Sequence, residues 1–158
     1  MDEAANPFPG ILRVTQAFFD RSTACLEEED SEFAPAPGMF TVAQQVAHVA
    51  QTFDWFLEGA FRPEGFDLDF AALDQKVRAV TSLEEARGWF ASSVERAIET
   101  LSSKSVEELT APLPEGPVMG GEPRTAIVAA IADHTTHHRG ALTVYARLRG
   151  KTPAMPYG

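Results

Sequence analysis

Apolar residues recur at steps of three and four in four long segments of the chain, and this helical periodicity restricts what the chain can fold into. The segments cover residues 11–28, 41–61, 82–103 and 124–149. No part of the sequence alternates like a series of strands. Amphipathic helices of this length bury their apolar faces most simply against one another. The sequence therefore predicts an all-α fold, a four-helix bundle.

Local signals mark the ends of these helices. Thr41 and Gln44 have the spacing of a capping box, and Ser82 and Glu85 repeat it. Gly150 follows the last helix and suits the C′ position. Acidic residues crowd the C-terminal end of the first helix, where the helix dipole disfavours them, so we expect that end to fray.

The connection between the second and third helices, residues 62–81, has consequences for the topology. It contains a predicted short helix at about 70–77. A connection of this length can run along the whole bundle, so its two flanking helices can lie parallel instead of forming a hairpin. We therefore expect a crossover between the second and third helices.

A stretch rich in proline and glycine, residues 110–123, separates a short helical turn at 105–109 from the last helix. The stretch cannot be helical and is long for a plain connection. Two interpretations remain open. It forms a lid or pocket wall, or it is a solvated loop with a short hairpin.

Bulk properties exclude several classes of protein. The 158 residues are 44% hydrophobic and 23% charged, which predicts one globular domain over residues 1–158. No apolar run can span a membrane, and the first residues lack the pattern of a signal peptide, so we expect a cytoplasmic protein. The net charge of −10 and the lack of a basic cluster argue against binding to nucleic acid.

Only one cysteine is present, Cys25. A single cysteine excludes an internal disulfide and any metal site built from several thiolates. Cys25 lies in an apolar segment, where a small buried side chain is a more common role than a reactive thiol.

The histidines carry the clearest chemical signal. His134 and His138 are four residues apart, so they lie one turn above each other on the face that the last helix buries. Two buried imidazoles need hydrogen bonds or a metal, and the four-residue spacing favours a metal. His48 lies in the second helix, but periodicity places it far from the centre of that helix's apolar face. The sequence alone leaves open whether His48 joins the pair.

Three residues near this pair are His137, Arg139 and Tyr145. His137 lies at the edge of the buried face, which predicts a pocket residue more than a metal ligand, and Arg139 points away. Tyr145 shares the face of His138 and can either donate a hydrogen bond to a site or pack in the core with its hydroxyl satisfied. No catalytic residue is identified, and His137 and Tyr145 are the candidates.

The run His134-Thr135-Thr136-His137-His138-Arg139-Gly140, an early histidine in the second helix and the tail Pro153-Ala154-Met155-Pro156-Tyr157-Gly158 resemble the DinB-like (damage-inducible, YfiT-type) metalloproteins. The resemblance covers essentially the whole chain. One departure is Ala141, because the family usually has glutamine after that glycine. The resemblance implies a four-helix bundle in the order up-down-down-up.

The resemblance also implies a site and an activity. The family's metal is held by one histidine of the second helix and two of the fourth, which correspond here to His48, His134 and His138. Members resemble thiol-dependent transferases and isomerases that use mycothiol, bacillithiol or glutathione, and others are described as metal-dependent hydrolases.

Three functional hypotheses follow. Three neutral imidazoles leave an open position on a divalent metal, with zinc or nickel as the best matches. The leading hypothesis is an enzyme whose metal activates a low-molecular-weight thiol for transfer to a small electrophile. A hydrolase in which the metal activates water is an alternative, but no glutamate lies beside the histidine pair as a general base. A non-catalytic metal- or ligand-binding bundle, in the form of a homodimer, is the other.

Overall fold

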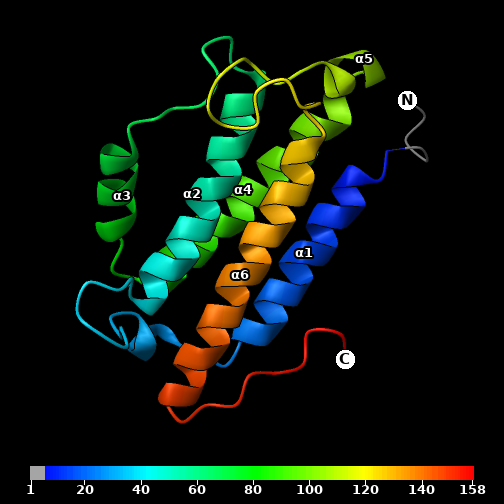
Figure 1. Cartoon of the computed structure of the whole chain (residues 1–158). Coiled ribbons are helices and arrows are strands. Elements are labelled where there is room, and N and C mark those ends of the chain that lie inside the picture. Colours follow the sequence, from blue (N-terminus) through cyan, green and yellow to red (C-terminus); the bar gives the residue numbers. More distant parts are fainter. Residues whose placement is uncertain (1–5) are drawn as a thin grey trace.

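The computed structural model describes residues 6–158 and contains no strands within that range. Four long helices form the body of the molecule (Figure 1). They are α1 (Phe8–Thr23), α2 (Val42–Phe61), α4 (Leu83–Ser103) and α6 (Ala126–Leu148). Three short elements lie in the connections: η2 (Glu28–Asp30), α3 (Phe70–Arg78) and α5 (Val106–Thr110). The all-α four-helix bundle is therefore confirmed.

The direction of the helices confirms the crossover. Helices α2 and α4 run the same way, while α1 and α6 run the opposite way (Figure 1). Ser31 ties the two parallel helices together at their first residues: its carbonyl accepts the Ala43 N–H at 3.0 Å, and its hydroxyl accepts the Leu83 N–H at 2.9 Å. The order is thus up-down-down-up.

Most of the predicted helix ends agree with the structure. The capping box of Thr41 and Gln44 is complete, with both reciprocal hydrogen bonds formed. At Ser82 the hydroxyl accepts the Glu85 N–H, but the return bond from Glu85 is missing, so this box is only half formed. Gly150 has φ +74° and follows α6 as expected, and the next N–H bonds back to the helix.

The predicted end of the first helix at residue 28 is wrong, because α1 ends at Thr23. The acidic residues that follow build a separate 3-10 turn. Its carboxylate Asp30 accepts the Glu27 N–H at 2.9 Å, which holds the chain in a turn rather than in a continued helix. Carboxylates favour such an N-terminal position and disfavour a helix C-terminus, so the charge pattern decides the boundary.

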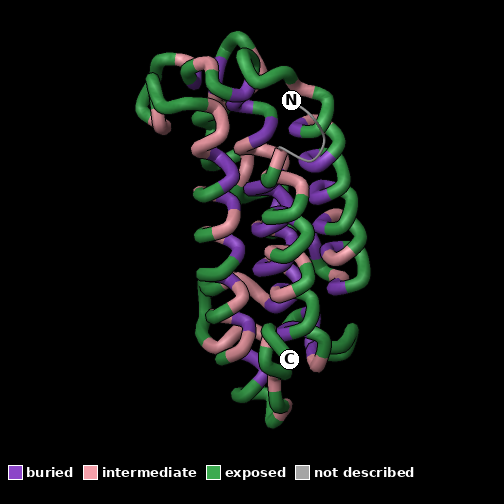
Figure 2. Tube along the Cα trace, turned by 90° about the vertical axis from the view of Figure 1, so that its right-hand side faces the viewer, coloured by how far each residue is buried: buried purple, intermediate pink, exposed green. Residues whose placement is uncertain are grey.

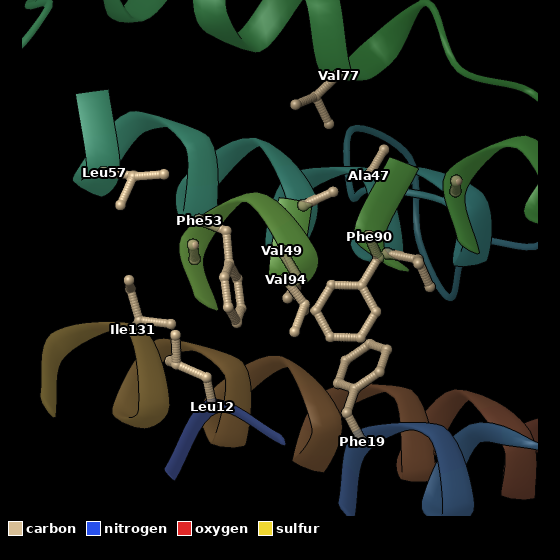
Figure 3. Close-up of a cluster of buried hydrophobic side chains, with 14 of the residues drawn as sticks. Leu12, Phe19, Ala47, Val49, Phe53, Leu57, Val77, Phe90, Val94 and Ile131 are labelled. Carbon is tan, nitrogen blue, oxygen red and sulfur yellow. The ribbon is translucent and has the colours of Figure 1, made fainter. Parts of the chain in front are cut away.

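The core lies between the four long helices (Figure 3). Phe19 of α1, Phe53 of α2 and Phe90 of α4 form its centre, with ring centroids 4.8 Å apart for Phe19 and Phe90 and 5.5 Å apart for Phe53 and Phe90. Each long helix turns one side inward and leaves the other exposed (Figure 2). No helix in the described part of the chain is long and apolar enough to cross a membrane.

The carboxylate of Asp30 fastens the end of the chain to the bundle. It is completely buried and contacts Arg149 Nε at 2.9 Å and Lys151 Nζ at 2.6 Å. Burial alone raises the pKa of Asp30, but the Glu27 N–H and the two cations outweigh burial, so the pKa lies below its usual value. The ionised carboxylate therefore stabilises the folded state.

We predict that Asp30→Asn lowers the free energy of unfolding by about 2 kcal/mol, because it leaves two cations beside a neutral group. Chemical denaturation at neutral pH measures the loss. The loss should shrink as the pH falls from the unfolded-state pKa of about 3.9 through the lower folded-state pKa, because the folded wild-type carboxylate becomes protonated only there. Glu29→Gln is the matched control, because Glu29 is exposed and contacts the same Lys151. Equal losses in the two variants would contradict this account.

Candidate metal centre

Three histidine side chains meet between α2 and α6. His134 Nε2 lies 3.2 Å from His48 Nε2 and 3.1 Å from His138 Nε2. His48 comes from α2, and the other two come from adjacent turns of α6. His138 is buried and the other two are half-buried. The structure thus brings His48, which the family resemblance implied as a ligand, together with the pair His134 and His138.

The spacing of these nitrogens suits a single metal ion. Two nitrogen ligands at about 2.0–2.1 Å from one zinc ion lie roughly 3.3 Å apart when the arrangement is tetrahedral. The two distances measured here are close to that value. Neutral imidazole is also a donor that zinc, nickel and copper accept readily. The residues present therefore fit a divalent transition metal.

Hydrogen bonds behind the site fix the tautomer of His138. The Tyr145 hydroxyl donates to the Phe40 carbonyl at 3.1 Å, and the Gln45 amide donates to that hydroxyl at 3.2 Å. The Gln45 Oε1 atom can only accept a hydrogen bond, so His138 Nδ1 carries the proton and donates to it. The proton on Nδ1 leaves the Nε2 lone pair of His138 facing the other two histidines.

Burial keeps the three imidazoles neutral. Burial first, and the neighbouring imidazoles second, lower the pKa of His134 to about 4 and that of His138 to about 3. Burial also lowers the pKa of His48. Since the ordinary histidine pKa is about 6.5, protons do not compete for these nitrogens at neutral pH.

Helical periodicity left His48 undecided because α2 packs against two neighbours. Its residues Val49 and Phe53 belong to the core that includes α4, while Gln45, His48 and Thr52 contact α6. A single apolar stripe therefore does not describe α2. The polar residues Gln45 and Thr52 were not identified as site residues from the sequence. Their spacing, one turn before and one turn after His48, could have indicated that they share its face of α2.

The two catalytic candidates lie apart from the three nitrogens. His137 is exposed, and its ring meets the His138 ring edge-on with centroids 5.0 Å apart. Tyr145 is 2% exposed and reaches His138 only through Gln45. The structure therefore gives Tyr145 a hydroxyl that is satisfied within the core.

A cavity of 410 Å³ opens beside His48 and His134. Its walls come from α2, from α3 and from Phe40, and Figure 1 shows α3 standing beside α2 on the outside of the bundle. Asp74 of α3 lines the cavity and forms an ion pair with Arg78 at 2.7 Å. Sequence reasoning missed Asp74, because only the crossover brings α3 next to the histidines.

The loop 110–123 and Cys25 both lie outside this cavity. The loop 110–123 contributes no residue to its walls and instead closes on itself through a bridge between Pro112 and Pro123. Cys25 is likewise absent from the walls and packs against the hydrophobic core.

Comparisons with known proteins agree with this architecture. The solved structure of YfiT from Bacillus subtilis, described as a probable metal-dependent hydrolase with an unusual four-helix bundle topology, matches with a TM-score of 0.70. The match covers 96% of this chain and 91% of that chain at 13% sequence identity, so it concerns the fold alone. No curated protein sequence matches the chain. A family model described as the DinB superfamily matches residues 11–142, and the chain therefore belongs to the DinB superfamily.

Proposed function

We propose that the chain is a metal-dependent enzyme that acts on a small molecule, with His48, His134 and His138 as the metal ligands. The observation that carries the proposal is the convergence of three neutral imidazoles at the edge of a cavity of 410 Å³. Zinc or nickel suits this donor set. The four long helices share one core, which supports a single domain over residues 1–158.

The reaction that we favour is transfer of a low-molecular-weight thiol to a small electrophile. His48, His134 and His138 would hold the divalent ion, and its Lewis acidity would lower the pKa of a thiol so that the thiol proton passes to solvent. The chain itself offers no thiol at the cavity, because Cys25 lies elsewhere. The cavity walls then hold the electrophile beside the histidines while the sulfur bonds to its carbon and displaces the leaving group.

Hydrolysis is the second candidate, and Asp74 is the observation that favours it. This carboxylate lines the same cavity as His48 and His134, where a general base is needed to activate water. YfiT, which shares the fold, is described as a probable metal-dependent hydrolase. Against hydrolysis, Asp74 is already paired with Arg78.

The non-catalytic bundle, the homodimer and the cytoplasmic location remain predictions.

We predict that the purified protein binds about one equivalent of zinc or nickel and that His48→Ala, His134→Ala and His138→Ala each lose most of it. Elemental analysis after dialysis measures the metal content. His137→Ala is the matched control, because His137 is exposed on the same helix and should retain the metal. Full metal content in the three ligand variants would rule out the assignment.

We predict that Gln45→Ala weakens metal binding by about tenfold to a hundredfold, because His138 loses the acceptor that fixes its tautomer. Competition with a chromophoric chelator measures the dissociation constant. Tyr145→Phe removes only the hydroxyl that anchors Gln45 and should have a smaller effect in the same direction. An unchanged dissociation constant in folded Gln45→Ala would show that Gln45 does not support the site.

We predict that the metal-loaded protein accelerates the reaction of 1-chloro-2,4-dinitrobenzene with glutathione, bacillithiol or mycothiol. Absorbance of the conjugate measures the rate. Asp74→Asn separates the two candidates: it should leave thiol transfer nearly unchanged but lower a hydrolysis rate by about a hundredfold or more. No rate above background with any of the thiols would contradict thiol transfer.

A further inference from the structure

Aromatic rings dominate the walls of the cavity beside the histidines. Phe40, Trp55, Phe56 and Phe70 line it together with Leu73. Trp55 and Phe56 come from α2, both about two turns after His48, while Phe70 is the first residue of α3. A ligand that reaches the histidines therefore lies against aromatic rings from two helices. Aromatic walls of this kind bind other apolar and aromatic groups.

The ring of Trp55 is held in place from behind. Its Nε1 donates to the Asp67 carbonyl at 2.7 Å, and its ring packs against Phe66 with centroids 4.8 Å apart. Phe66 in turn lies directly on the backbone of Gly59, where an added Cβ would come within 2.2 Å of its ring. Glycine at this position thus allows the stack of Phe66 and Trp55 that forms the wall. The cavity is built by the fold before any ligand binds.

The walls offer no free charge to a ligand. No lysine or arginine of the described chain lines the cavity, and Asp74, the one carboxylate there, is neutralised by Arg78 at 2.7 Å. The Arg78 guanidinium itself covers the outer face of Phe40, 4.7 Å from the ring centroid. An ionic group that enters the cavity loses hydration and gains no ion-pair partner from the walls. An anion therefore gains nothing from the walls, and a cation gains only the contact with the aromatic faces.

We propose that this cavity selects uncharged aromatic or apolar substrates and holds them against the paired rings of Trp55 and Phe70, whose centroids lie 6.2 Å apart, next to the three histidines. The proposal rests on the proposed function only in taking the occupant of the cavity as the substrate. The cavity walls bind uncharged ligands more tightly than charged ones, and this preference exists whether or not the protein converts the ligand. The preference can therefore be measured without an activity assay.

The test is calorimetric binding of three matched probes to the protein as purified and after treatment with a chelator. The probes are 3-nitrotoluene, 3-nitrobenzoate and trimethyl(3-nitrophenyl)ammonium, which share a ring and differ in charge. In the chelator-treated protein we expect 3-nitrotoluene to bind at least about tenfold more tightly than either ion, because the ions lose hydration without gaining an ion-pair partner. In the protein as purified the comparison is made with the cation alone, because a metal ion at the histidines would itself attract 3-nitrobenzoate. Equal or tighter binding of either ionic probe to the chelator-treated protein, or of the cation to the protein as purified, overturns the proposal.

A pair of variants locates the preference in the cavity. Phe70→Lys places a cation in the wall and should weaken binding of 3-nitrotoluene while strengthening binding of 3-nitrobenzoate. Leu68→Lys makes the same change in charge two residues earlier, outside the cavity, and should leave both affinities unchanged. Both side chains are exposed, so the fold tolerates the changes, and thermal unfolding checks this. Identical effects of the two variants contradict the proposed binding position.

Failure of this test is distinct from failure of the proposed function. If the histidine variants keep their metal but 3-nitrotoluene shows the expected preference, the ligand assignment fails and the cavity proposal stands. If the metal assignment holds but the three probes bind equally, the cavity proposal fails and the metal centre stands.

Discussion

The antiparallel contact between α2 and α6 is the constraint on which the candidate site depends. One end of this contact is held where Arg124 Nε donates to the Ala60 carbonyl at 2.9 Å. The other is held where Gln45 meets Tyr145 and His138. Between these two points the helices have only one register. That register places His48 opposite the turn that carries His134 and His138, so the packing of two helices determines whether three imidazoles meet.

The crossover contributes to the site as well as to the topology. Parallel α2 and α4 require a connection that returns along the bundle, and this connection contains α3. Because α3 lies beside α2, it supplies Phe70, Leu73 and Asp74 to the cavity next to the histidines. The same segment that makes the order up-down-down-up thus provides one wall of the site. A simple hairpin between α2 and α4 has no room for such a wall.

Much of the fold was predictable from the sequence, because periodicity and capping residues act locally. The four long helices, the cap at Thr41 and the inward pair His134 and His138 all follow from residue spacing. The predicted end of α1 was wrong although its signal is local: the acidic run forms its own turn, in which Asp30 accepts the Glu27 N–H. Arg149 and Lys151, far along the chain, then bind the same carboxylate.

The remaining parts of the site depend on contacts between distant segments. His48 was undecided because α2 presents one side to α4 and another to α6, and no spacing within α2 indicates which neighbour a flank residue faces. Gln45 and Asp74 were missed for the same reason: their roles exist only once α6 and α3 lie against α2. The family resemblance implied that His48 is a metal ligand, and the packing of α2 against α6 explains why it lies beside His134 and His138.

X-ray absorption spectroscopy of the purified protein, at the absorption edge of the metal that it contains, tests the central claim most directly. The account predicts one ion per chain whose first shell contains three imidazole nitrogens at about 2.0–2.1 Å and one further light ligand. A first shell with sulfur from Cys25, or one dominated by carboxylate oxygens, would contradict it.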